Sequence, residues 1–544
     1  MIRSRLELWA RAAAAALFFF GFASHAQTAR QFMVAAAHPL AVDAGYAVLK
    51  SGGSAVDAAV AVQMVLGLVE PESSGIGGGA FMLYWAQSEK RLRSYDGRET
   101  APAAARPDRF LASDARPIAF VDALGGRSVG VPGVLRMLEL AHKRHGKLRW
   151  AELFQYAIFA AEEGFAMPAQ LHERLASERL LRADPGARRI FYDADGNAKP
   201  AGARLVNPEY GATLRTIATR GADALYNGEI ARDIVQAVRA HAKPGDLSEE
   251  DLAAYRALER APVCGPYRGW RVCSMGPPSS GGIAVLQMLG ILERVAFERA
   301  ARHSHAAVHL FTEAGRLAYA DRARYAGDPD FVQVPVARLL DGKYLDERAR
   351  RIGERSMRQA LPGDFEAGTS HFSIVDASGN AVAMTTTIES TFGSRIMVRG
   401  FLLNNQLTDF DFRPGGANEV APRKRPRSSM APTVVFEGDG QVRLLVGSPG
   451  GPNIINYVAR ALVATLDWGF DVQSAIALPN FGSRNGPTLL ESGTVYETLR
   501  ADLESRNHVV ESPPLPSGLH AIERVPGGWR GGADPRREGA ARGD

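Results

Sequence analysis

The stretch EAGTSHFSIVDASGNAVAMTTTIES constrains the fold more than any other part of the chain. Two apolar, β-branched runs flank the polar turn DASGN, which predicts an antiparallel hairpin of two buried strands. Pairing about Ser378 sets Thr369 opposite Thr387, while a slip of one residue would place Thr386 or Ile388 there instead. A hydroxyl at position 387 could hydrogen-bond that of Thr369, although threonine also simply suits a strand.

The order of helix-like and strand-like patterns predicts the fold class. The stretch AVDAGYAVLKSGGSAVDAAVAVQMVLGLVEP predicts two helices separated at a Gly-Gly pair, with Ser54 and Asp57 placed as a capping box. Helical patterns predominate from about residue 131 to 354, and short β-branched runs follow Thr369. Helices first and a sheet-rich final third indicate an α+β fold.

The composition is that of an ordinary globular protein. The chain has 544 residues, of which 46% are hydrophobic and 23% charged, so it can bury a large core. Its formal net charge of +5 is small for this length and argues neither for nucleic acid nor for a membrane surface as a partner.

The first residues have the three-part layout of a secretory signal. Arginines precede an apolar run from Ala12 to about Phe22, and small residues lead to Ala26. The run is shorter than the roughly 20 residues that a membrane-spanning helix needs, which disfavours an anchor as the alternative. We therefore expect residues 1–26 to be a signal peptide and the mature protein to be exported, periplasmic or secreted, without a membrane span.

The two cysteines, Cys264 and Cys273, lie in APVCGPYRGWRVCSM. Pro266 and Gly269 suggest a turn between two short strands, and export would supply an oxidising compartment. A disulfide and a pair of free buried thiols both stay open at this point, because the register of the turn decides the Cα separation.

Two further motifs bear on metal and phosphate binding. His305 and His309 in HSHAAVH are four residues apart and could share a helix face, but the pattern H-E-x-x-H of a zinc enzyme is missing, so ordinary helix histidines are favoured. The glycine cluster from Gly75 to Gly79 lacks the Lys-Ser/Thr of a phosphate-binding loop. We expect no metal and no cofactor.

The junction between Gly368 and Thr369 offers a nucleophile. A threonine hydroxyl needs a base, and the α-amine of a chain terminus, which titrates at roughly pH 8, can serve as one. If the bond before Thr369 is cut, this residue carries nucleophile and base together. The preceding ALPGDFEAG contains Pro and two glycines and is expected to be an exposed segment that can leave. The alternative is an ordinary threonine at the start of a strand.

Several blocks, taken in order, resemble the γ-glutamyltransferases, which are N-terminal-nucleophile hydrolases. They run from about Val34 to the end of the chain: GGSAVDAAVA, SGIGGGAFMLY, YDGRETAP, PPSSGG, YADRARYAGDP, TSHFSIVD, LLNNQLTDF, RPRSSMAPT and GSPGG. The resemblance implies a four-layer αββα sandwich made as one precursor that cuts itself between Gly368 and Thr369. A large fragment, 27–368, and a small fragment, 369–544, would then stay together as one domain.

The resemblance also implies the reaction. Thr369 would attack the γ-amide of a glutathione-like donor and form a γ-glutamyl acyl-enzyme. The acyl group would pass to water or to the amine of an amino acid or peptide, so that the partners are small molecules. Gly450 and Gly451 would form the oxyanion hole, because glycine lets backbone N–H groups approach the tetrahedral oxygen.

The glutamyl end of the donor would be held by groups that the same blocks supply. Arg98 in DGRET resembles the arginine that pairs with the α-carboxylate through two parallel bonds. Ser428 and Ser429 resemble the hydroxyls on that carboxylate, and Gln406 and Asp409 the groups that receive the α-amine.

Two departures from the family pattern bear on the substrate. Glu389 stands where many relatives have asparagine, and a carboxylate there would also suit an ammonium group. The stretch between Asp409 and Ser428 is short, whereas members with a lid over the site carry a longer insert there. An open groove is implied, one that could admit γ-glutamyl polymers or glutaryl side chains.

Two alternative functions stay open. One is an amidase of the same superfamily that resembles the glutaryl or cephalosporin acylases and does not need an α-amine; Gln406 and Asp409 disfavour it. The other is an exported binding protein that keeps the fold and is never processed. The complete set of Thr369, Arg98 and the serine and glycine pairs disfavours this second alternative.

Overall fold

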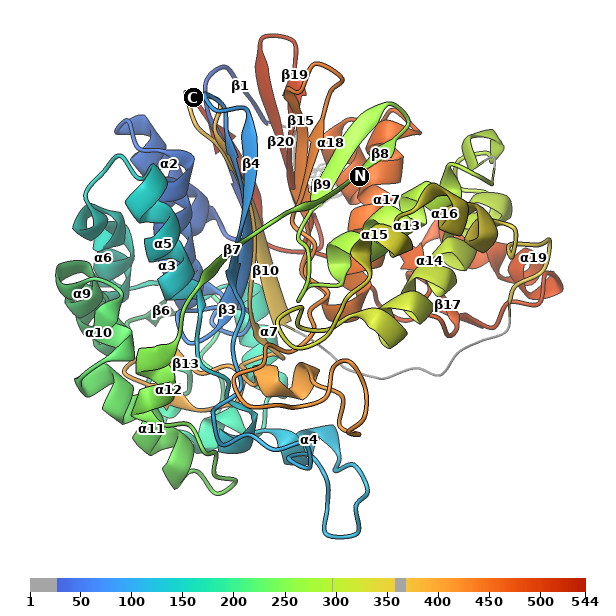
Figure 1. The fold of residues 1–544 in the computed structure, drawn as a ribbon. Coiled ribbons are helices and arrows are strands. Elements are labelled where there is room, and N and C mark those ends of the chain that lie inside the picture. The colour runs from blue at the N-terminus through green and yellow to red at the C-terminus, as the bar shows by residue number, and fades with distance from the viewer. Residues whose placement is uncertain (1–26, 296, 358–367) are drawn as a thin grey trace, which may run out of the picture.

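The computed structural model describes residues 27–295, 297–357 and 368–544. The predicted signal peptide and most of the segment expected to leave Thr369 lie outside these residues. Two seven-stranded sheets stack face to face, with helices on the outer face of each (Figure 1). The α+β class and the four-layer αββα sandwich are therefore confirmed.

The first sheet combines strands from both halves of the chain. Its strand order is β21 (Ala540–Gly543), β2 (Met33–Ala36), β10 (Gly368–Val375), β11 (Ala381–Glu389), β3 (Gly79–Ala86), β4 (Arg91–Gly97) and β7 (Leu258–Arg260). The hairpin predicted from the sequence forms its centre. Because β2 and β3 flank this hairpin, Thr369 lies inside a shared sheet and not at the edge of a separate domain.

The second sheet is built in the same way. Its strand order is β1 (Gln27–Ala29), β20 (Gly528–Ala533), β19 (His520–Val525), β15 (Val442–Gly447), β14 (Thr433–Phe436), β9 (Trp270–Ser274) and β8 (Val263–Tyr267). The two short strands suggested on either side of the turn at Pro266 and Gly269 are β8 and β9. The sequence did not predict β7, which is only three residues long and interrupts the region predicted as mostly helical.

Helices form the two outer layers (Figure 1). Beside the first sheet lie α2 (Pro39–Lys50), α3 (Ala55–Val69), α5 (Val134–His145), α6 (Gln155–Glu163) and α9 (Pro208–Arg220). Beside the second sheet lie α13 (Gly281–Leu292), α14 (His305–Tyr325), α17 (Ile454–Leu466) and α18 (Val472–Ala477). No helix in the described ranges is long and apolar enough to cross a bilayer.

Alternation along the strands builds separate cores. In β2, Val34 packs under the helices of the first sheet, while Met33 packs between the two sheets. The same alternation places Met82 of β3 outward and Leu83 inward. Successive side chains of a strand point to opposite faces, so one strand can serve both cores.

The structure confirms two local predictions and decides one question that the sequence left open. Thr369 pairs with Thr387 as predicted, with a register shift between Gly368 and Thr369. Ser54 and Asp57 form the capping box of α3. A disulfide joins Cys264 to Cys273 across the β8–β9 pair, which decides the question that the sequence left open.

Candidate active site

Thr369 lies at the start of β10, on the wall of a cavity of about 700 Å³. Its side chain is 3% exposed, so it reaches the cavity with little access to bulk solvent. The cavity brings together predicted site residues from both halves of the chain, namely Arg98, Thr369, Thr387, Glu389, Gln406, Asp409, Ser428, Ser429 and Gly451.

The hairpin register positions the hydroxyl of Thr369. Its Oγ1 lies 3.4 Å from Oγ1 of Thr387, a long hydrogen bond. Oγ1 of Thr387 accepts a second hydrogen bond, of 2.8 Å, from the backbone N–H of Glu389. The N–H therefore fixes the hydroxyl of Thr387, and that hydroxyl in turn neighbours the one on Thr369.

Arg98 lies directly after β4 and is 1% exposed. Its guanidinium donates to the backbone carbonyls of Pro426 and Arg427 at 3.2 and 3.0 Å. It also forms an ion pair with Asp409, whose carboxylate accepts a 2.7 Å hydrogen bond from the side-chain amide of Gln406. The predicted carboxylate-binding arginine and the predicted amine-binding pair thus form one hydrogen-bonded cluster.

Glu389 ends β11 and also lines the cavity. Its carboxylate accepts hydrogen bonds from the side chains of Asn405 and Thr408. Burial, and then the nearby charge of Asp409, raise the pKa of Glu389 to about 8. Beside Asp409 and Asp411, which are paired with arginines, the cavity therefore holds a carboxylate, that of Glu389, which gains a proton near neutral pH.

Ser428 and Ser429 form another part of the cavity wall. Oγ of Ser428 accepts a 3.1 Å hydrogen bond from the backbone N–H of Met430. Oγ of Ser429 accepts a 2.8 Å hydrogen bond from Arg322 of α14. Both hydroxyl oxygens are held by N–H donors, so each has its own proton left to donate elsewhere.

The glycine pair precedes α17. Gly450 and Gly451 have φ angles of 130° and 53°, a backbone conformation that residues other than glycine rarely adopt. A Cβ on Gly450 would lie 2.5 Å from a ring carbon of Tyr457. Only Gly451 of the two lines the cavity.

The short segment after Asp409 forms one wall of the cavity. Residues 410–413 line it, and the ring of Phe412 stacks on that of Phe110 with centroids 4.5 Å apart. Asp411 pairs with Arg427 at 3.0 Å. This wall therefore combines a segment of the second half of the chain with Phe110 from the first half.

Three contributors to the site were missed in the sequence. Asn405 and Thr408 stand beside predicted residues in LLNNQLTDF, and a search for donors to Glu389 in that block could have found them. Arg322 lies in the block YADRARYAGDP, but nothing in its sequence neighbourhood relates a helix residue to the distant serine pair.

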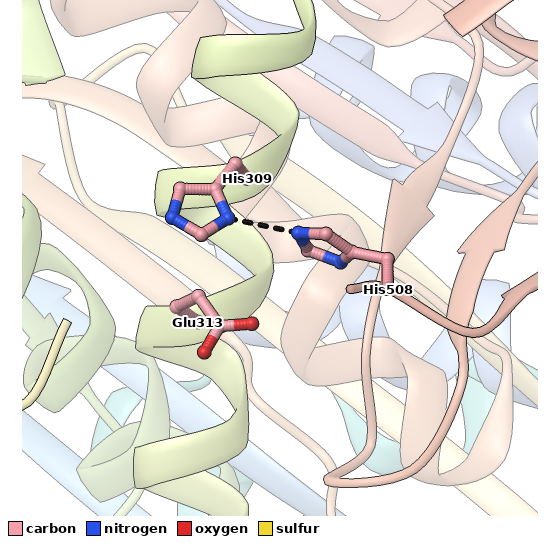
Figure 2. A group of neighbouring side chains, drawn as sticks. All are labelled: His309, Glu313 and His508. Carbon is pink, nitrogen blue, oxygen red and sulfur yellow. Dashed lines mark hydrogen bonds between the residues drawn. The ribbon is translucent and has the colours of Figure 1, made fainter. Parts of the chain in front are cut away.

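His305 and His309 do not come together as a pair of metal ligands on one helix face. His309 contacts His508, with Nδ1 and Nε2 2.8 Å apart, and Glu313 lies beside them (Figure 2). His305 takes no part in this group and instead lies near Asp502. A helix-face pair of His305 and His309 is therefore wrong as a metal site.

Hydrogen bonds tie the His309 group to the segment that follows Gly353. Glu313 accepts from Ser356 Oγ, from the N–H of Met357 and from Arg316 at 2.7, 2.9 and 2.9 Å. Nε2 of His309 lies 2.8 Å from the carbonyl of Gly353. The group thus fixes residues 353–357, the last described residues before the segment that precedes Gly368.

The contact between His309 and His508 should make the stability of the protein depend on pH. Burial, with the charges of His309, Arg316 and Arg506 adding to it, lowers the pKa of His508 to about 3, and burial also lowers that of His309, beside Glu313. The unfolded chain takes up protons at roughly pH 6.5, so the free energy of unfolding falls as pH drops below this value.

We expect the melting temperature to fall between about pH 6.5 and pH 4, and to fall less in His508→Gln. The measurement is differential scanning fluorimetry across pH, with His305→Gln on the same helix as the control. An equal fall in wild type and His508→Gln would contradict this role of His508.

Comparisons with known proteins agree on one family. The model for "Gamma-glutamyltranspeptidase" matches residues 41–543. Glutathione hydrolase proenzymes of Bacillus subtilis (strain 168) and Escherichia coli (strain K12) are 38% and 37% identical, and each match covers 94% of this chain and 91% of the relative. Acylase ACY 1 proenzyme of Pseudomonas sp. (strain SE83) is 36% identical over 92% of this chain and 91% of the relative.

Solved structures show the same likeness. Cephalosporin acylase from Bacillus halodurans superposes with a TM-score of 0.86 at 27% identity, covering 97% of this chain and 98% of the other. Gamma-glutamyltranspeptidase of Helicobacter pylori superposes with a TM-score of 0.56 at 34% identity, covering 58% of this chain and 90% of the other.

Proposed function

Because the chain belongs to the gamma-glutamyltranspeptidase family, we propose that it cuts itself before Thr369 and then cleaves γ-glutamyl amides, transferring the acyl group to water or an amine. One observation carries this function for the chain itself. Thr369 starts a buried strand on the wall of a cavity that also contains the Arg98–Asp409–Gln406 cluster.

Processing supplies the base that the hydroxyl of Thr369 needs. In the uncut chain the nitrogen of Thr369 is an amide and cannot accept a proton. Once the Gly368–Thr369 bond is cut, the free α-amine lies on the same residue as the nucleophile. The hydroxyl of Thr387, fixed by the N–H of Glu389, supports the orientation of the attacking oxygen.

The cluster of Arg98, Asp409 and Gln406 suits the amino-acid end of a γ-glutamyl donor. In this proposal the α-carboxylate binds Arg98 and the hydroxyls of Ser428 and Ser429, each of which has a proton to donate. The α-ammonium binds Asp409, Gln406 and Glu389.

The acyl carbon then reacts at Thr369, and the backbone N–H groups of Gly450 and Gly451 stabilise the tetrahedral oxygen. The φ angles of this pair and the contact of Gly450 with Tyr457 require glycine at these positions and support this role. The acyl-enzyme releases its glutamyl group to water or to an amine that enters the cavity.

Export through a signal peptide is part of the same proposal. It rests on the N-terminal sequence alone, with its apolar run ending in small residues before Gln27. The large fragment, 27–368, and the small fragment, 369–544, would remain associated, since strands of both make up each sheet.

Substitution of the nucleophile tests the whole scheme. We expect Thr369→Ala to remain one uncut chain and to lose hydrolysis of a γ-glutamyl anilide completely, because both steps need this hydroxyl. A denaturing gel and an anilide assay measure the two effects. Ser378→Ala, in the turn of the same hairpin, is the matched control and should be cut and active. A cut or active Thr369→Ala protein would refute the assignment.

A glutaryl amidase is the second candidate, and the Bacillus halodurans cephalosporin acylase favours it through its structural likeness. A glutaryl group lacks the α-amine, so it would leave Asp409 and Glu389 without the ammonium that they suit. We therefore expect faster cleavage of γ-glutamyl than of glutaryl anilides.

The raised pKa of Glu389 adds a pH test of its contact with the amine. The group is largely neutral at pH 7 and gains its charge as pH rises through about 8. The KM for a γ-glutamyl anilide should therefore fall from about pH 7 to about pH 8.5, and this fall should vanish in Glu389→Gln. A glutaryl anilide serves as the control and should not show the fall. Equal pH profiles of wild type and Glu389→Gln on the γ-glutamyl donor would rule out this contact.

A further inference from the structure

Arg322 is an arginine of the cavity wall with no ion-pair partner among the residues that the structure describes. Four other arginines line the cavity. Arg98 and Arg427 pair with Asp409 and Asp411 respectively, whereas Arg413 is exposed, and neither it nor Arg484 forms an ion pair within the described residues. Arg322, on α14, forms no ion pair with any residue that the structure describes. Burial, and next the charge of Arg427, lower its pKa to about 10, so it stays positively charged at neutral pH.

The hydrogen bonds of Arg322 leave one edge of its guanidinium uncommitted. Nε donates to Oγ of Ser280 and Nη2 donates to Oγ of Ser429, both at 2.8 Å. Nη1 makes no hydrogen bond to the described residues. A guanidinium presents its donors in a planar fork, so the remaining edge can still take a carboxylate oxygen.

These contacts also orient the serine pair. A guanidinium N–H can only donate, so Oγ of Ser429 must accept, and its own proton is available for a ligand in the cavity. Ser280 in turn donates from its hydroxyl to the carbonyl of Ser428 at 2.5 Å. Arg322 thus holds the serine pair from one side, while Arg98 holds the carbonyl of Arg427, the residue before it.

The charge balance of the cavity calls for a second cation. Arg98 shares its charge between Asp409 and a substrate carboxylate, so Arg98 alone compensates that carboxylate incompletely. Asp411 is likewise paired with Arg427. Among the cavity-wall arginines without an ion pair in the described residues, Arg322 is the one that donates a hydrogen bond to the side chain of Ser429.

We propose that Arg322 determines specificity for the donor's α-carboxylate: it orients the hydroxyl of Ser429 toward that carboxylate and supplies the positive charge that balances it. This inference rests on the proposed γ-glutamyl activity. The substrate class is therefore an acyl donor with a free carboxylate at the far end of its chain, and donors neutral at that end are disfavoured.

The experiment compares two donors that differ only at that group: a γ-glutamyl anilide and its α-carboxamide counterpart. In Arg322→Gln, the KM for the carboxylate donor should rise roughly tenfold or more, because charge-assisted hydrogen bonds are lost, with kcat changed by less than about threefold. The KM for the carboxamide donor should stay within about twofold. Arg322→Lys, which keeps the charge, should recover part of the loss.

Two controls separate this effect from structural damage. Arg324→Gln removes an exposed arginine from the same helix and should leave both donors unchanged. Arg98→Ala should likewise raise the KM for the carboxylate donor more than the KM for the carboxamide donor. Because Arg322 acts partly through Ser429, the double variant with Ser429→Ala should lose less than the product of the two single losses.

The outcomes distinguish the two claims. An uncut wild type that is inactive on both donors would overturn the proposed function and this inference with it. The inference alone would be overturned if wild type is processed and active but KM rises equally for both donors in Arg322→Gln and in Arg322→Lys. Processing on a denaturing gel and the melting temperature show whether each variant is folded.

Discussion

The pairing of β10 with β11 is the interaction on which the rest of the site depends. It places Thr369 opposite Thr387, and the register shift between Gly368 and Thr369 brings Glu389 opposite Gly368. A slip of one residue would turn every side chain of the strand to the other face and take Thr369 away from the cavity. The turn is fixed by Asp376, whose carboxylate accepts N–H groups of Ser378 and, from α3, Ala55.

The balance of charge around this hairpin explains why the site suits a zwitterion. Arg98 and Asp409 neutralise each other, and both remain able to contact a substrate. Glu389 exchanges its proton near neutral pH, and Arg322 has no carboxylate in an ion pair among the described residues. A donor that carries both an ammonium and a carboxylate can pair its ammonium with the carboxylates of the site and its carboxylate with the arginines. No buried charge is then left unpaired.

The hairpin register and the α3 capping box could be predicted from local sequence patterns, because residues close together in the chain decide both. The four-layer sandwich and several residues that line the cavity could be predicted from the resemblance to a known family. Arg322 and the His309–His508 contact could not be predicted, since each depends on the packing of α14 against segments more than 100 residues away. The disulfide also needed the register of the β8–β9 pair, which the sequence left undecided.

The central claim is that Thr369 becomes a chain terminus and then carries the acyl group. Intact mass spectrometry of the purified protein, acid-quenched during turnover of a γ-glutamyl donor, tests this most directly. The account predicts a fragment that begins at Thr369, found both free and heavier by one glutamyl group. A single unmodified chain, or a glutamyl group on the other fragment, would contradict it.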